Sequence, residues 1–283
     1  MKTYYDCIPC FIKQTISVLK MIDCNDTDCE KILHTVLQHM SHIDFHLTPP
    51  EMARTIHRII RETSGNDDPF LDEKKRYQKL TLQLLPQLEQ NMLLSDDPFK
   101  SAILLAIAGN SIDHGVYHDL SEQHALNALE QGLHLPLIGD IDQFSHAIDQ
   151  AESILYLADN AGEIVLDKLL LNQLPLEKTT FVVRGGPILN DALMADAEQA
   201  GITELVPVIG NGDNTPGTLL KYCSKEFQEK FKQADLIIAK GQGNYETLSD
   251  VEGNIFFLLK AKCSVIATNI GCQIGSAILY HRD

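Results

Sequence analysis

The sequence predicts an α/β protein with a mostly parallel, Rossmann-like sheet, helices on both faces of that sheet, and a mostly helical first half. Two observations support this fold class. Apolar residues recur at helical spacing up to about residue 150, and short apolar runs then alternate with helical segments to the end. We therefore expect a helical subdomain over residues 1–150 and an α/β domain over residues 151–283.

The first half contains seven segments with helical patterning. Ile8, Phe11, Ile12, Ile16 and Leu19 mark the apolar face of the first segment. The second and third segments are Cys29–Met40 and Glu51–Arg61, and the others are Leu71–Leu94, Phe99–Ala108, Leu120–Leu133 and Gln143–Glu152. The fourth segment contains Pro86, so we expect either a kinked helix or two helices there.

The second half alternates strands with helices, which is typical of a parallel sheet. Helices are expected over Ile164–Leu171, from about Asn190 to Ala200, and over Pro216–Lys232. Ile255–Leu259 is an apolar run, and the expected strands are Ile154–Ala158, Thr179–Val183, Glu204–Ile209, Leu236–Ala239 and Ser264–Thr268.

Composition excludes several classes of function. The 283 residues include 39 acidic and 23 basic side chains, for a net charge of −16. Such a chain is unsuited to nucleic acid, whose phosphates require clustered basic residues. No apolar run is long enough to cross a membrane, and the first residues lack the apolar core of a secretory signal. We expect a cytoplasmic protein with a small-molecule partner, and the oligomeric state is left open.

The seven cysteines do not suggest a disulfide framework, because their number is odd and no export signal precedes them. Cys223, Cys263 and Cys272 are expected to pack as small hydrophobic residues. Cys7 and Cys10 are two residues apart, a spacing suited to a metal site, a redox pair or structural thiols alike. Cys24 and Cys29 could complete a zinc site, although their spacing is not that of a zinc finger.

Polar or glycine-rich segments follow four of the predicted strands. In a parallel sheet such segments meet at one edge, where ligands bind. Asp159, Asn160 and Asp191 would offer oxygen ligands for a divalent metal. Lys240, between a strand and glycines, suits an anion. The four segments are Asp159–Glu163, Arg184–Asp191, Gly210–Asn214 and Lys240–Glu246.

Two polar positions have both a structural and a functional interpretation. Asn110 and Asp113 follow an apolar helix, where they could cap its end or face the sheet edge and close the pocket. Glu163 could act as a base or cap the helix that follows it, and its first-turn position favours the cap.

Five motifs, taken together, resemble the damage-control metal phosphatase family, a former domain-of-unknown-function family of ARMT-like proteins. The resemblance covers nearly the whole chain, and the Cys7–Cys10 pair is similar to the stand-alone microbial branch. The motifs are Cys7–Cys10, Gly109–Asp113, Asp159–Glu163, Gly186–Asp191 and Lys240–Glu246.

The resemblance implies an α/β/α sandwich with a helical subdomain and metal-dependent hydrolysis of phosphate monoesters such as sugar phosphates. By motif, Asp159, Asn160 and Asp191 match the ligands of a divalent metal (Mn²⁺, Ni²⁺, Co²⁺ or Mg²⁺). Lys240 matches the residue that holds the phosphate, and either water or Asp159 could be the nucleophile. The residues expected around the substrate are Asn110, Asp113, Arg184, Lys240, Gly241 and Asn244.

Two other functions compete with this one. A nucleotide- or S-adenosylmethionine-binding methyltransferase would suit the predicted sheet, but the segment after Ala158 lacks a glycine-rich turn. A metal-binding or redox module built on Cys7 and Cys10 would leave the polar strand ends unexplained.

Overall fold

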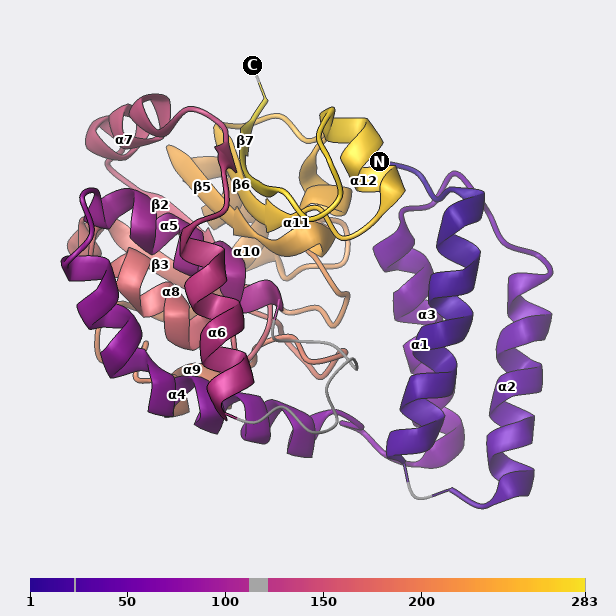
Figure 1. The fold of residues 1–283 in the computed structure, drawn as a ribbon. Coiled ribbons are helices and arrows are strands. Elements are labelled where there is room, and N and C mark those ends of the chain that lie inside the picture. The colour runs from indigo at the N-terminus through magenta and orange to yellow at the C-terminus, as the bar shows by residue number, and fades with distance from the viewer. Residues whose placement is uncertain (23, 112–121, 283) are drawn as a thin grey trace.

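A computed structural model describes residues 1–22, 24–111 and 122–282, which form a seven-stranded sheet covered by helices (Figure 1). The strands are β1 Leu137–Ile138, β2 Ile154–Leu157, β3 Thr179–Val183, β4 Val208–Gly210, β5 Leu236–Lys240, β6 Ile255–Lys260 and β7 Ala277–His281. The first nine helices are α1 Ile8–Met21, α2 Asp26–Met40, α3 Pro49–Ser64, α4 Leu71–Leu93, α5 Pro98–Ala108, α6 Glu122–Leu133, α7 Ile141–Gln150, α8 Ile164–Leu171 and α9 Met194–Ala200. The last three are α10 Lys225–Gln233, α11 Gly241–Leu248 and α12 Ser264–Ile270.

The sheet is mostly parallel, which confirms the predicted fold class. Its strand order is β1-β7-β6-β5-β2-β3-β4, and β6 and β7 form its antiparallel pair. From β2 the chain moves outward through β3 to β4, and it then returns to place β5 on the other side of β2. The carboxyl ends of β2 and β5 therefore flank a topological switch point, where α/β sheets bind ligands.

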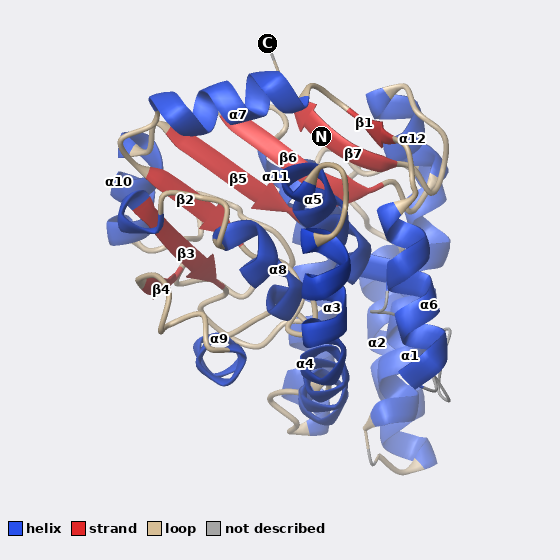
Figure 2. Cartoon of the chain, turned by 60° about the vertical axis from the view of Figure 1, so that its left-hand side comes forward, coloured by secondary structure: helices blue, strands red, loops and turns tan. Residues whose placement is uncertain are grey.

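Alternate residues of the central strands pack into two separate hydrophobic cores, one on each face of the sheet. Ile154 and Tyr156 pack with the helices α4–α8 on one face. Leu155 and Leu157 pack with α10, α11 and α12 on the other. Figure 2 shows the sheet between these two groups of helices, which confirms the three layers.

The helices α1–α3 have a small core of their own. Val18, Ile32 and Ile60 are completely buried in it, and Figure 1 shows the three helices standing beside the α/β part. The helices α4–α7 instead share a core with the sheet, and β1 belongs to the sheet itself. A boundary between domains at residue 150 stays a prediction, whereas the hydrophobic cores divide near residue 70.

Several local predictions are wrong. Residues 264–268, predicted as a strand, begin the helix α12, whose buried residues are Ile266 and Ala267. The helix predicted over residues 216–232 is formed only as α10, because residues 216–224 make turns. The sequence also did not predict β1 and β7. Residues 71–93 form one helix that includes Pro86, which decides for one helix between the two alternatives expected there.

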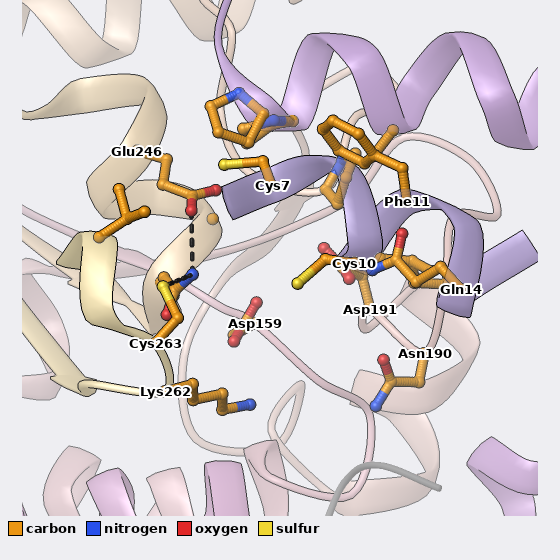
Figure 3. Close-up of a pocket in the computed structure, with 18 of the residues that line it drawn as sticks. Cys7, Cys10, Phe11, Gln14, Asp159, Asn190, Asp191, Glu246, Lys262 and Cys263 are labelled. Carbon is orange, nitrogen blue, oxygen red and sulfur yellow. Dashed lines mark hydrogen bonds between the residues drawn. The ribbon is translucent and has the colours of Figure 1, made fainter. Parts of the chain in front are cut away.

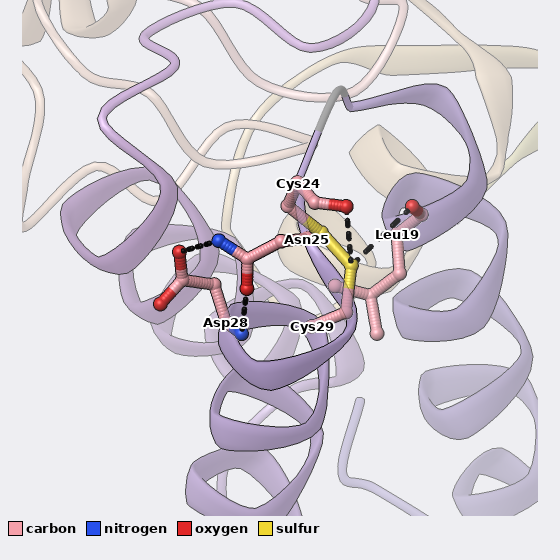
Figure 4. The surroundings of a disulfide bond; sticks show 5 residues. All are labelled: Leu19, Cys24, Asn25, Asp28 and Cys29. Atoms are coloured by element: carbon pink, nitrogen blue, oxygen red, sulfur yellow. Dashed lines mark hydrogen bonds between the residues drawn. A yellow bond between two sulfur atoms is a disulfide. The ribbon is translucent and has the colours of Figure 1, made fainter.

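One pair of cysteines also differs from expectation. Cys24 and Cys29 form a disulfide between the end of α1 and the first turn of α2 (Figure 4). The short connection brings their Cα atoms to 6.0 Å, within the usual range for a disulfide, so neither thiol is free to complete a zinc site. Cys223 is buried, and Cys263 and Cys272 are half-buried against the same hydrophobic core.

Candidate active site

A pocket of about 280 Å³ opens at the carboxyl edge of the sheet. Segments that follow β2, β3, β5 and β6 form one side of it, and the first turns of α1 and α3 form the other. Figure 3 shows residues from both sides facing each other across this pocket. The switch point of the sheet is therefore closed over by the α1–α3 region.

Asp159, Asn160 and Asp191 come together because the β2–β3 pairing continues beyond the strands. The main-chain N–H of Ala192 donates to the carbonyl of Asp159 at 2.8 Å, and that of Ala161 donates to the carbonyl of Asn190 at 2.9 Å. An isolated bridge also pairs Asn160 with Asp191. All three predicted metal ligands line the pocket.

Each of these three side chains keeps one oxygen atom without a hydrogen bond among the described residues. Oδ2 of Asp159 accepts from Nδ2 of Asn110 at 2.6 Å and from Nδ2 of Asn160 at 3.1 Å. Oδ2 of Asp191 accepts from Nε of Arg184 at 2.7 Å. The atoms that remain are the Oδ1 oxygens of Asp159, Asn160 and Asp191. Carboxylate and amide oxygens suit a hard divalent cation, so this donor set fits the expected metal.

The electrostatics of the two carboxylates also favour a cation. Burial raises the pKa of Asp159 to about 8, and the nearby charges of Glu163 and Asp191 add to this effect. Burial likewise raises the pKa of Asp191, although Arg184 opposes it. Both carboxyl groups therefore resist ionisation, and a bound divalent cation would stabilise their charged forms.

Lys240 does not face the pocket, contrary to its predicted role as the phosphate-holding residue. Its side chain is completely buried. Its ammonium group donates to the carbonyl of Ala106 at 2.8 Å, to Oε1 of Glu163 at 2.6 Å and to Oδ1 of Asp167 at 2.5 Å. All three donors are used, so no donor remains for a phosphate oxygen.

Glu163 occupies the N-cap position of α8, but its side chain makes no capping hydrogen bond, so the predicted capping role of the side chain is wrong. It is fully buried and accepts from Asn110 at 2.6 Å, from Asn160 at 2.9 Å and from Lys240 at 2.6 Å. Burial opposes the charge of Lys240, but Asp167 and Glu163 outweigh it and raise the pKa of the lysine. A charged Lys240 thus fixes Glu163, which fixes the amide groups of Asn110 and Asn160.

The other predicted substrate residues that the structure describes contact the proposed metal ligands or the main chain next to them. Arg184 is buried and bonds to Asp191, and buried Asn244 donates to the main-chain carbonyls of Ala158 and Lys240. Gly241 has a φ of +80°, and a Cβ atom there would overlap the carboxylate of Asp159. Glycine is therefore needed at this position. Asp113 lies outside the described residues.

Cys7 and Cys10 line the pocket from the start of α1, together with Cys263 from the opposite side. Burial raises the pKa of both Cys7 and Cys10. Within the described part of the chain, no group of three or more His, Cys, Asp or Glu side chains could hold a metal ion. The geometry does not support a second metal on these thiols, and a redox role stays a prediction.

Several residues that line the pocket were not among the predicted site residues, and the polar ones include Asn190, Glu246 and Lys262. Lys262 follows β6 and is exposed, and Figure 3 shows it extending past Asp159 toward the side where Asn190 lies. The helix α12 was predicted as a strand, which hid the fact that residues 261–263 are another strand end at this edge. Correct assignment of α12 would have revealed Lys262.

Comparison with known proteins decides the family. The model of the damage-control phosphatase ARMT1-like domain matches residues 3–278. The chain belongs to this damage-control phosphatase family. Residues 1–22, 24–111 and 122–282 contain no helix with the length and apolarity to span a membrane.

Archaeal members of the damage-control phosphatase family are similar along most of their length. A damage-control phosphatase of Archaeoglobus fulgidus is 36% identical over 80% of each chain. Damage-control phosphatase PH1575 of Pyrococcus horikoshii is 33% identical over 98% of this chain and 97% of its own. A crystal structure of a DUF89 family protein from Pyrococcus horikoshii has a TM-score of 0.91, with 32% identity and full coverage of both chains. The family resemblance seen in the motifs is thereby confirmed.

Proposed function

We propose that this protein is a metal-dependent phosphatase that hydrolyses phosphate monoesters of small metabolites such as sugar phosphates. The observation that carries this proposal is the set of three spare oxygens on Asp159, Asn160 and Asp191, which share one pocket with the ammonium group of Lys262. A divalent metal (Mn²⁺, Ni²⁺, Co²⁺ or Mg²⁺) would be held by those oxygens. When bound, it would neutralise charge on the phosphate and act as a Lewis acid.

Lys262 and Asn190 take the role that the motif had given to Lys240. Lys262 is close enough to Asp159 for its charge to lower the pKa of that carboxyl group. The Nδ2 group of Asn190 is buried and has no hydrogen-bond partner in the described ranges. A spare donor and a cation beside the proposed metal ligands suit phosphate oxygens, whose charge must be balanced during phosphoryl transfer.

The buried residues behind the pocket orient its ligands. Asn110 donates from one amide group to both Asp159 and Glu163, and Lys240 holds Glu163 in place. Because these groups are buried and bonded on several sides, Asp159 and Asn160 are held in one orientation before substrate arrives. Such preorganisation is what phosphoryl transfer requires most from a protein.

The family assignment favours this function over a methyltransferase. The segment that follows β2 also carries Asp159 and Asn160 in place of the glycine-rich turn that binds dinucleotides. Nothing in the pocket favours the competing function.

Release of inorganic phosphate tests the proposal. We expect the metal-free protein to hydrolyse phenyl phosphate and sugar phosphates only after Mn²⁺, Ni²⁺, Co²⁺ or Mg²⁺ is added, with at least about a hundredfold stimulation. Excess chelator should abolish the activity. Equal release with and without chelator, or no release with any of the four metals, would refute it.

Replacement of Lys262 tests the phosphate-binding side. Lys262→Met is expected to raise KM for phenyl phosphate about tenfold, because one charge-assisted hydrogen bond is lost. The free energy of unfolding should change little, since Lys262 is exposed. Lys232→Met, an exposed lysine on α10, is the matched control. Unchanged KM in Lys262→Met would assign phosphate binding to another group.

A further inference from the structure

The pocket has a second polar end that the proposed chemistry does not use. Figure 3 shows Glu246 beside Cys7 and Cys263, on the side of Asp159 away from Lys262 and Asn190. Glu246 belongs to α11 and lines the same pocket as the proposed metal ligands. A substrate whose phosphate lies at Asp159 would therefore extend its alcohol part toward Glu246.

Glu246 has a nearly buried carboxyl group, and few interactions with the protein offset the loss of its hydration. Its exposed fraction is 9%. Oε1 accepts a hydrogen bond from Nε2 of Gln242 at 2.9 Å, and no ion pair neutralises the side chain in the described part of the structure. Burial raises the pKa of Glu246 to about 7, although the Gln242 hydrogen bond and the N-terminal ammonium group oppose this. A carboxyl group kept in such surroundings has an unfilled capacity to accept hydrogen bonds.

Gln242 adds a second unfilled acceptor. Its Nε2 group donates to Glu246, and its Oε1 atom is buried without a partner among the residues described. The walls around this end are formed by weakly polar groups, including the thiols of Cys7, Cys10 and Cys263. Among the residues that line the pocket, this end thus offers acceptors and no ammonium or guanidinium group, the reverse of the end that contains Lys262.

We propose that Glu246, together with Gln242, forms a subsite that binds the leaving alcohol of the substrate and selects alcohols rich in hydroxyl or amino donors over apolar or anionic ones. This inference rests on the proposed phosphatase function and adds a criterion for its substrates. Hydroxyl and amino groups would satisfy the spare acceptors, an aromatic ring would leave them unpaired, and a carboxylate would be repelled. The whole pocket of about 280 Å³ lies just below the usual range for small-ligand sites, roughly 300–1,000 Å³, so it suits a small phosphate ester.

Steady-state kinetics with three phosphate esters tests the subsite. Glucose 6-phosphate supplies hydroxyl donors, phenyl phosphate supplies none, and 3-phosphoglycerate carries a carboxylate. In Glu246→Ala, we expect KM for glucose 6-phosphate to rise about tenfold and KM for phenyl phosphate to stay within about twofold, because one hydrogen bond to a charged group is lost. In Glu246→Gln, which keeps the side-chain shape, KM for 3-phosphoglycerate should fall about threefold as repulsion is removed.

The controls separate the possible failures. Glu252→Gln changes an exposed glutamate after α11 and should leave all three KM values unchanged. Activity on phenyl phosphate reports whether each variant is folded. Equal changes of KM for all three esters, or no change, would overturn the subsite while leaving the phosphatase function intact. No phosphate release from any ester by the wild-type protein would overturn both.

Discussion

Asp159→Asn is expected to lower kcat/KM for phenyl phosphate by at least about a thousandfold, because the substitution removes the negative charge with which a proposed ligand attracts the metal. Asp159 occupies the centre of the pocket, between the ends marked by Lys262 and Glu246 (Figure 3). The side chain keeps its size, so the packing changes little, but its single oxygen can serve either the metal or the amide groups of Asn110 and Asn160 and not both. Phosphate release at saturating Mn²⁺ measures the effect.

The matched control for this substitution is Asp142→Asn, on the exposed side of α7. It removes the same charge from a chain whose net charge is −16 without approaching the pocket. Its kcat/KM should equal that of the wild-type protein. If Asp159→Asn retained more than about a tenth of the wild-type value, Asp159 would not be a metal ligand.

Lys240→Met is expected to destabilise the protein by about 3–5 kcal/mol, since it leaves the buried carboxylates of Glu163 and Asp167 without their cation. This loss is a large part of the stability of an ordinary domain. Activity should fall as well, because Glu163 would no longer hold Asn110 and Asn160. Urea unfolding followed by circular dichroism gives the free energy of unfolding.

A variant with compensating substitutions separates the effect of the unpaired buried charges from the effect of the changed side-chain shape at Lys240. Lys240→Met combined with Glu163→Gln and Asp167→Asn removes all three charges and should recover at least about half of the lost stability. Lys262→Met, by contrast, should weaken substrate binding at full stability. If Lys240→Met kept wild-type stability and lost only substrate affinity, then Lys240 would contact the phosphate as the motif suggested.

The convergence of the three proposed metal ligands could be predicted from sequence, because strand ends of a parallel sheet meet at one edge. Asp159 and Asn160 follow β2, and Asp191 follows β3, its neighbour in the sheet. The strand Thr179–Val183 was predicted with correct ends, because its β-branched and aromatic residues lie between charged residues on both sides. The local sequence pattern was therefore enough to predict the fold class and the proposed metal ligands.

Prediction of the direction in which the Lys240 side chain points required the alternation of side chains along β5 as well. Ile238 packs on the α5 and α8 side of the sheet, and Ala239 packs on the other side. Lys240 is the last residue of β5, so alternation sends it to the side of Ile238, away from the pocket. Glu163 and Asp167 are four residues apart and both meet its ammonium group. The pattern was present in the sequence, but glycines beside Lys240 suggested an anion site instead.

Other features depend on contacts between distant segments. Lys262 and Glu246 enter the pocket only once α12 and α11 are placed, and α12 was predicted as a strand because its first residues are apolar and β-branched. The opposite wall comes from Cys7 and Cys10 on α1, more than 140 residues before Asp159 in the chain. No local pattern predicts such a contact.

Calorimetric titration of the metal-free protein with Mn²⁺ tests the central claim most directly. We expect one bound ion per chain in the wild-type protein and in Lys262→Met, and much weaker binding in Asp159→Asn. The expected outcome would assign the metal to the oxygens of Asp159, Asn160 and Asp191 without reference to any substrate. Undiminished binding of Mn²⁺ by Asp159→Asn would contradict that assignment.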